Sequence, residues 1–266
     1  MPAQQLKRDL LIPDSEKREA IRLMALADDT FFNAVCKLFP KVAEFILRLI
    51  MEIPDLVVKK VETQSDERSM INRSIELDIL AEDSSGKLYD IEVENSDSRA
   101  IPERARYHSA VLDSNRLEKA KRFEELPETY IIFITKGDPL GTGLQLCHVE
   151  RVIMEQKKLF NDREHIIYAS MKYADETPLG QMLHDFLCTN PQEMLCEELA
   201  KAADYLKNDD KGVSEMCEVM EKLINVDRRN AILELLNAGV SREVIMKSYK
   251  ISKEELEELI APLASD

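Results

Sequence analysis

The stretch from Ile75 to Asn95 reads IELDILAEDSSGKLYDIEVEN, and it predicts a hairpin of two strands around a turn that contains Gly86. Apolar and polar residues alternate on both sides of the turn, which is the period of a strand with one buried face. The face expected to be buried carries Ile75, Leu77, Ile79, Ala81, Tyr89, Ile91 and Val93. The face expected to point away from the core carries Glu76, Asp78, Asp90, Glu92 and Glu94. Like charges side by side on a sheet repel, so something must compensate them.

A five-residue turn from Asp83 to Lys87 sets the register of this hairpin. The opposed pairs are then Glu82 with Leu88, Asp78 with Glu92, and Glu76 with Glu94. Opposed side chains have Cβ atoms about 4.5–5.5 Å apart. Two carboxylates at that distance can share a hard divalent cation such as Mg²⁺, which prefers oxygen ligands. The alternative is the solvated face of a half-exposed hairpin with no metal, and the pattern alone leaves both open.

The composition predicts a cytoplasmic globular protein. The 266 residues suffice for one domain with a full core and a helical appendage. No apolar run approaches the ~18 residues of a membrane helix, and the first residues have no apolar signal core. The cysteines are odd in number, widely spaced and without a C-x-x-C pair, so we expect reduced thiols and neither a zinc site nor a disulfide framework.

The net charge of −15 excludes a protein that coats nucleic acid without specificity. One local segment, from Arg99 to Arg122, is nevertheless basic, with seven lysines and arginines against three acids. This segment directly follows the acidic hairpin. It is either a nucleic-acid contact beside a site on the hairpin or simply a solvated helix face.

The remaining pattern predicts an α/β core with a mixed sheet, followed by helices. Two helices are expected between Glu16 and Met51, broken at Asp28–Thr30, with Pro40 bending or restarting the second. After them we expect a strand from Asp55, a loop over 65–73, the hairpin, a helix from Pro102 to Phe123, strands at 129–135, 144–153 and 165–171, and helices from Pro178 onward. The predicted domains are 1–177 and a helical C-terminal region, 178–266.

Several segments together resemble the PD-(D/E)XK nuclease family transposases, which are relatives of the recombination-promoting nucleases. They are DDTFFNAVCK (28–37), RSIELDILAEDSSGKLYDIEVEN (73–95), RARYHSAVLDSNRLEKAKRFEELPETYIIFITKGDPLGTG (104–143), LFNDREHIIY (159–168) and LGQMLHDFLCTNPQEML (179–195). The similarity runs from about residue 28 to about residue 220, and its specificity lies in the combination. It implies a restriction-endonuclease-like core in which a mixed sheet is flanked by helices.

The resemblance also implies an activity, that of a divalent-metal-dependent DNA endonuclease that uses Mg²⁺ or Mn²⁺. Asp78 and Glu92 would be the metal ligands, and the backbone carbonyl of Val93 a further ligand. Asp29 matches an acidic position on the first core helix and would complete the acidic cluster. Its alternative role is that of a helix cap.

Glu94 departs from the family pattern, which has Lys or often Gln at that position. A carboxylate there can serve as a base or as an additional metal ligand, but it cannot neutralise an anion. Phosphate contacts are therefore expected from Arg99, Arg104 and Arg106. The same departure supports an alternative function, a catalytically weak or inactive nuclease fold that acts as a protein-interaction or regulatory module.

Two histidine-containing segments are interpreted as structural. His108 lies in RARYHSAV and is expected to pack a helix on the sheet. The triplet His184–Phe186 is expected to form a structural corner.

The tail predicts a small helix-turn-helix unit. Ser241 would cap one helix, and Ser252 with Glu255 fits a capping box. The residues expected to pack between helices are Val244, Ile245, Ile251 and Leu256. A recognition helix should be basic, but KEELEELI is acidic, so the C-terminal helices are expected to make protein contacts such as homo-oligomerisation rather than to read DNA.

Overall fold

The computed structural model describes residues 14–67, 75–117 and 120–260. The described chain divides into two compact units, one that ends at Val213 and one that begins at Ser214. No helix among these residues is both long and apolar enough to cross a membrane. The division into domains 1–177 and 178–266 stays a prediction.

Three helices precede the sheet: α2 (Asp14–Leu23), α3 (Asp29–Leu38) and α4 (Pro40–Ile50). The expected break before α3 is present. Pro40 restarts the second predicted helix rather than bending it, because proline donates no N–H to the preceding turn and suits the first helical position.

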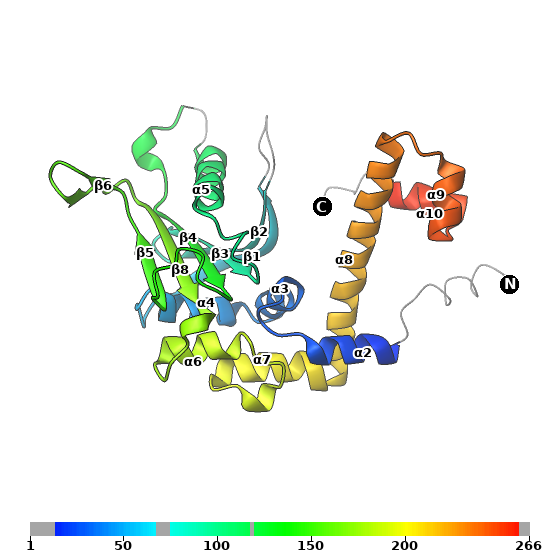
Figure 1. Cartoon of the computed structure of the whole chain (residues 1–266), viewed down its shortest axis with the longest axis horizontal. Helices are drawn as coiled ribbons and strands as arrows, with labels where there is room; N and C mark the ends of the chain where they lie inside the picture. Colours follow the sequence, from blue (N-terminus) through cyan, green and yellow to red (C-terminus); the bar gives the residue numbers. More distant parts are fainter. Residues whose placement is uncertain (1–13, 68–74, 118–119, 261–266) are drawn as a thin grey trace. The chain divides into compact units, whose positions relative to one another are not determined.

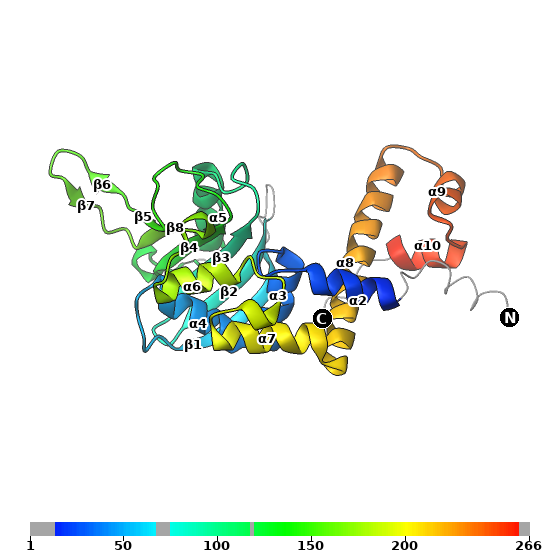
Figure 2. The same ribbon diagram turned by 60° about the horizontal axis from the view of Figure 1, so that its bottom comes forward.

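The main sheet has six strands in the order β1-β2-β3-β4-β8-β5. Their bounds are β1 (Val58–Glu67), β2 (Ile75–Asp83), β3 (Leu88–Glu94), β4 (Thr129–Thr135), β5 (Leu146–Val149) and β8 (Glu164–Ser170). β3, β4 and β8 are parallel neighbours and the other pairs are antiparallel, which confirms the predicted mixed sheet. β6 (Val152–Ile153) and β7 (Lys158–Leu159) form a separate ribbon that projects beside β5 (Figure 2).

Three boundaries of the predicted elements are wrong. The strand expected at 144–153 is divided into β5 and β6, which belong to different sheets. The residues Ser65–Glu67, expected in a loop, extend β1, while the rest of that loop, up to residue 73, lies outside the described residues. The helix expected from Pro102 to Phe123 is α5 (Pro102–Arg116), followed by the short helix η1 (Phe123–Glu125). A continued helix would have little to bury, since Phe123 is 79% exposed.

The register of the hairpin agrees with the prediction as far as the strands pair, with Glu82 opposite Leu88 and Ile79 opposite Ile91. Asp83 closes the turn, because its Oδ1 accepts the amides of Ser85 at 2.8 Å and of Lys87 at 3.0 Å. Gly86 has φ +86°, a conformation that favours glycine.

Both faces of the sheet are covered. α3 and α4 lie on one face and α5 lies on the other (Figure 1). Under α5, Ala105 and Leu112 pack against Ile131, Phe133 and Tyr168. The apolar hairpin face is buried, as predicted. The carboxylates of β3 are buried as well, which contradicts the alternative of a solvated face: Asp90 and Glu92 are 0% exposed and Glu94 is 3% exposed. β3 is a central strand, and α5 closes its second face.

After the sheet come the short helix η2 (Met171–Tyr173), α6 (Pro178–Asp185), the short helix η3 (Pro191–Glu193) and α7 (Glu197–Asn208). α6 and α7 both contact α4. The corner expected at His184–Phe186 is present, because Asp185 accepts the amides of Leu195 at 2.8 Å and Cys196 at 2.7 Å. No disulfide joins the cysteines of the described residues.

The second unit contains most of α8 (Asp210–Asn237), together with α9 (Arg242–Tyr249) and α10 (Lys253–Ile260). Its core is formed by Ile232, Ile245, Ile251 and Leu256. Val244 does not join them and is 53% exposed, so that assignment is wrong. Both predicted caps are present: Ser241 accepts the amide of Val244, and Ser252 and Glu255 exchange side-chain and backbone hydrogen bonds.

Candidate active site

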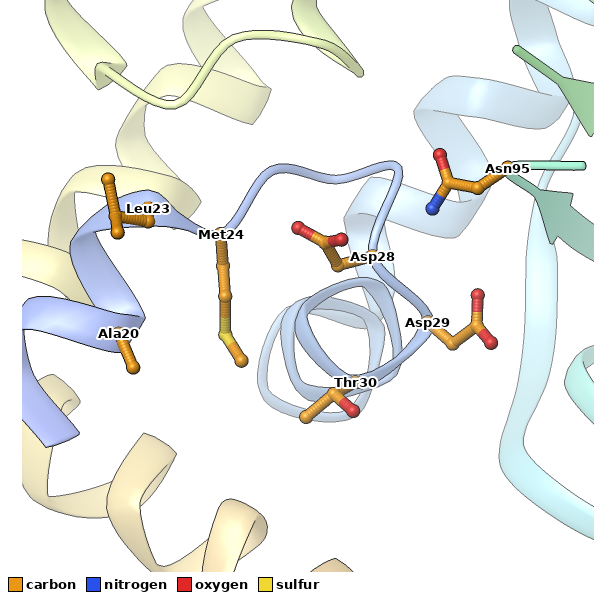
Figure 3. A pocket seen from close by; sticks show the side chains of 7 residues that line it. All are labelled: Ala20, Leu23, Met24, Asp28, Asp29, Thr30 and Asn95. Atoms are coloured by element: carbon orange, nitrogen blue, oxygen red, sulfur yellow. The ribbon is translucent and has the colours of Figure 1, made fainter.

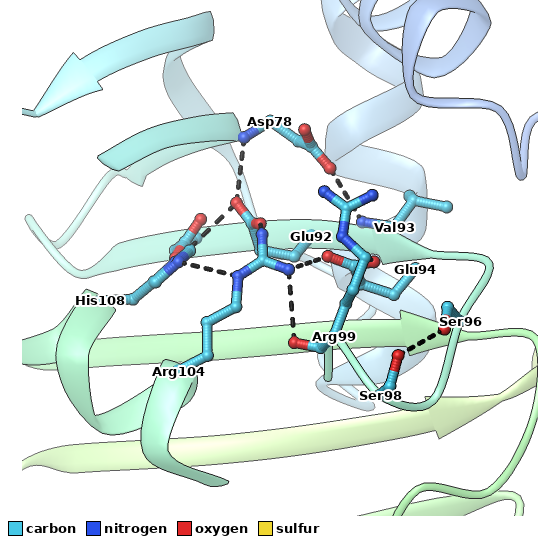
Figure 4. A network of polar contacts seen from close by, with 10 residues as sticks. Asp78, Glu92, Val93, Glu94, Ser96, Ser98, Arg99, Arg104 and His108 are labelled. Atoms are coloured by element: carbon cyan, nitrogen blue, oxygen red, sulfur yellow. Dashed lines mark hydrogen bonds and ion pairs between the residues drawn. The ribbon is translucent and has the colours of Figure 1, made fainter. Parts of the chain in front are cut away.

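The backbone pairing between β2 and β3 ends next to Asp78 and Glu92. Beyond Ile79 and Ile91, side chains take over the hydrogen bonds. The amide of Asp78 donates to Oε1 of Glu92 at 3.0 Å, and the amide of Val93 donates to Oδ2 of Asp78 at 3.0 Å (Figure 4). Each carboxylate therefore binds the backbone of the opposite strand.

Burial makes negative charge costly at both acids. It raises the pKa of Asp78 to about 6, and the nearby charge of Asp29 acts in the same direction. Burial raises the pKa of Glu92 well above its ordinary value, and the charges of Asp90 and Asp78 add to the rise. The site therefore favours a proton or a cation beside these carboxylates.

Arginines from the segment after β3 supply part of that positive charge. Nη2 of Arg104, on α5, lies 2.5 Å from Oε2 of Glu92, and its Nη1 pairs with Oε1 of Glu94. Nε of Arg99 lies 3.4 Å from Oε2 of Glu94. Both oxygens of Glu94 are thus paired with guanidinium groups. Arg106, the third predicted phosphate contact, is exposed on α5.

Asp29 lies at the edge of this site. It is the first residue of α3, and the N-cap position belongs to Asp28, whose side chain does not cap the helix. Burial raises the pKa of Asp29. Asp28, Asp29 and Asn95 line a surface hollow that Met24 closes on the other side (Figure 3).

Two further residues, which the sequence did not assign to the site, complete the cluster. Asp90 and His108 are both buried, with His108 Nδ1 2.8 Å from Oδ2 of Asp90. Nε of Arg104 lies 3.2 Å from Nε2 of His108. The sequence contained a signal for both residues, since Asp90 shares the strand face of Glu92 and His108 follows Arg104 by one helical turn.

The structure also places two other charged residues of the hairpin, Glu76 and Lys87. In the backbone register, Glu76 lies opposite Asp66 of β1, and its opposition to Glu94 stays a prediction. Lys87, at the turn, forms an ion pair with Glu128, 2.9 Å away.

The donor set at the split between β2 and β3 fits a hard divalent cation. Asp78 and Glu92 offer oxygen ligands from adjacent strands, and a cation would stabilise the charged forms that burial and neighbouring acids disfavour. Two groups of three side chains among the described residues lie close enough together to hold a metal: Asp90 with Glu92 and His108, which includes Glu92 itself, and His184 with Asp185 and Cys188. His108 has both ring nitrogens bonded, and Asp185 accepts two amides.

A comparison with protein families gives one match. Residues 44–226 match the model of the PD-(D/E)XK nuclease family transposases. The chain belongs to this family. No curated protein and no solved structure matches the chain.

Membership of the PD-(D/E)XK nuclease family transposases confirms the fold class that the sequence predicted. The matched range contains the whole sheet with α5, and therefore Asp78, Glu92, Glu94 and the arginines. Asp29 lies outside it. The family supports a nuclease-related activity, and PD-(D/E)XK nucleases generally use divalent metals.

Proposed function

We propose that the protein is a divalent-metal-dependent DNA endonuclease that hydrolyses phosphodiester bonds. Asp78, Glu92 and the carbonyl of Val93 would hold Mg²⁺ or Mn²⁺, with Asp29 as an outer member of the acidic cluster. The observation that carries the proposal is the pair of carboxylates at the split between β2 and β3, where burial and neighbouring acids raise both pKa values. Bound Mg²⁺ supplies Lewis-acid polarisation of the phosphate and lowers the pKa of an attacking water.

The protein's own groups would orient the DNA around this centre. Arg99 keeps 62% of its side chain exposed while it contacts Glu94, so its guanidinium can also meet a phosphate. Arg106 is exposed on the same basic segment. Glu94 would act at the third motif position by holding Arg99 and Arg104 beside the scissile phosphate. Arg99 and Arg106 would thus offer exposed positive charge to DNA on a chain whose net charge is −15.

A plasmid-nicking assay tests the proposal. Wild type is expected to nick DNA with Mg²⁺ or Mn²⁺ and to stop when the metal is chelated, while Asp78→Ala is expected to be inactive. Glu82→Ala is the matched control, because Glu82 is a half-buried carboxylate of the same strand that lies four residues away. Calorimetric titration with Mn²⁺ should show binding to wild type and to Glu82→Ala but not to Asp78→Ala. Equal binding by all three proteins would refute the metal site.

One observation favours the second candidate, a nuclease fold that acts as a protein-interaction or regulatory module. Arg104 already neutralises part of the charge on Glu92 and Glu94, so a metal must coexist with a guanidinium or displace it. A folded wild type that nicks no DNA with either metal would establish this alternative over the enzyme. Self-association through the C-terminal helices and a cytoplasmic location stay predictions.

A further inference from the structure

A buried chain of hydrogen bonds links β3 to Arg104 through one imidazole. Asp90 and His108 are 0% and 2% exposed, and their side chains are joined at 2.8 Å. The second nitrogen of His108 faces Nε of Arg104 at 3.2 Å. The two terminal nitrogens of the same guanidinium contact Glu92 and Glu94 (Figure 4).

The chemistry of arginine fixes the direction of these bonds. A guanidinium has only donors, so Nε of Arg104 donates and Nε2 of His108 must accept. The ring proton therefore resides on Nδ1 and is donated to Oδ2 of Asp90. Asp90 thus selects the tautomer that can accept from Arg104.

The rest of the surroundings leaves Arg104 little freedom. Its guanidinium carbon lies 5.6 Å from the ring centre of Phe133 on β4, and the His108 ring is tilted against the same aromatic ring at 6.2 Å. An apolar side chain at position 108 could fill this space between α5 and the sheet. It could not accept the Nε–H, so packing alone does not account for a histidine.

We infer that Asp90 and His108 are positioning residues that hold Arg104 in the orientation in which it contacts Glu92 and Glu94. In this orientation Arg104, on α5, supplies a positive charge to the site. Glu94, on β3, cannot supply it because its side chain is an acid. The consequence for catalysis rests on the proposed function, whereas the hydrogen-bond chain itself does not.

The first test needs neither metal nor activity. Long-range ¹H–¹⁵N NMR of the full chain, with His108 identified by its absence in His108→Gln, should show the neutral Nδ1–H tautomer at neutral pH. The Nε–H signal of Arg104 should shift in His108→Leu and remain near its wild-type position in His108→Gln, since a glutamine oxygen can accept that bond. An Nε2–H tautomer, or an Arg104 signal unaffected by His108→Leu, would overturn the inference.

The second test measures single-turnover nicking at saturating DNA with Mg²⁺, and DNA affinity with Ca²⁺ in place of Mg²⁺. His108→Leu should lower the rate constant by about 10–100-fold, as is typical when a residue that orients a site residue is lost. DNA affinity should change less, and His108→Gln should recover most of the rate. Ser109→Ala is the matched control, because Ser109 is buried on the same helix and its hydroxyl has no hydrogen-bond partner among the described residues.

The outcomes distinguish the positioning role of Asp90 and His108 from the proposed nuclease function. Equal rates in His108→Gln and His108→Leu would overturn the positioning role, whether both are impaired or both match wild type. If wild type does not nick DNA, the proposed function fails, and the NMR result alone decides whether Asp90 and His108 position Arg104. If His108→Leu does not fold, the tautomer in wild type and the rate of His108→Gln still decide.

Discussion

Replacing Asp78 with asparagine should stabilise the metal-free protein. Asp78 contributes one of the crowded charges at the split between β2 and β3, and burial is the main reason that its pKa rises from 3.8 to about 6. The side-chain amide that the substitution introduces has the same shape as the carboxylate, so its oxygen can still accept the N–H of Val93. Asp78→Asn therefore removes the charge and keeps the hydrogen bond.

The sign of the effect follows from proton linkage. Because the pKa of Asp78 is higher in the folded state, the native protein binds more protons than the unfolded chain between pH 3.8 and about 6. The stability of wild type therefore falls as the pH rises through that window. A rise from 3.8 to about 6 corresponds to about 3 kcal/mol once Asp78 is ionised. We expect Asp78→Asn to exceed wild type by about 1–3 kcal/mol at pH 8, with the difference disappearing near pH 4.

Chemical denaturation with a chelator present, at several pH values between 4 and 8, measures this difference. Glu82→Gln is the control and should follow wild type at every pH. Adding Mn²⁺ at about 100 times its dissociation constant should stabilise wild type by about 2.7 kcal/mol and leave Asp78→Asn nearly unchanged. An Asp78→Asn protein that is less stable than metal-free wild type at pH 8 would refute the electrostatic reasoning, because the carboxylate would then be a net stabilising group.

Three further predictions concern the third motif position, the basic segment and the second unit. Glu94→Gln and Glu94→Lys should each lower the nicking rate by about 10–100-fold, because neither side chain offers two carboxylate oxygens to Arg99 and Arg104, and a gain of activity in either would show that Glu94 marks a decayed site. Arg106→Ala should reduce the slope of log affinity for DNA against log salt by about 0.9, and an unchanged slope would place the DNA elsewhere. Ser241→Ala removes the cap of α9 and should lower the free energy of opening of this helix, measured by hydrogen exchange, by about 0.5–2 kcal/mol, with no change in the nicking rate. An unaltered exchange rate in α9 would contradict the role of the cap.

The hairpin was predictable because its determinants are local. Alternation with period two assigns Ile79 and Ile91 to the buried face, and the five-residue turn around Gly86 sets the register that the strands adopt. Pro40 likewise determines the start of α4 through its own covalent structure. The closeness of Asp78 and Glu92 follows from that register, so these two central residues of the candidate site could be predicted from the sequence.

The burial of the carboxylate face was decided by tertiary structure alone. Alternation separates two faces of a strand but does not state what covers the second one. Here β3 pairs with β4, and α5 packs across both strands, so Glu92 and Glu94 are enclosed. The same packing brings Arg104 to these two acids.

For Asp90 and His108 as well, the sequence determined one part of the arrangement and the tertiary structure the other. The sequence determined that Asp90 shares a strand face with Glu92 and that His108 follows Arg104 by one helical turn. Whether the strand face and the helix meet depends on contacts between segments that are distant along the chain. These contacts depend on how the apolar faces of α5 and the sheet fit together, and such a fit has no period that a sequence pattern can reveal.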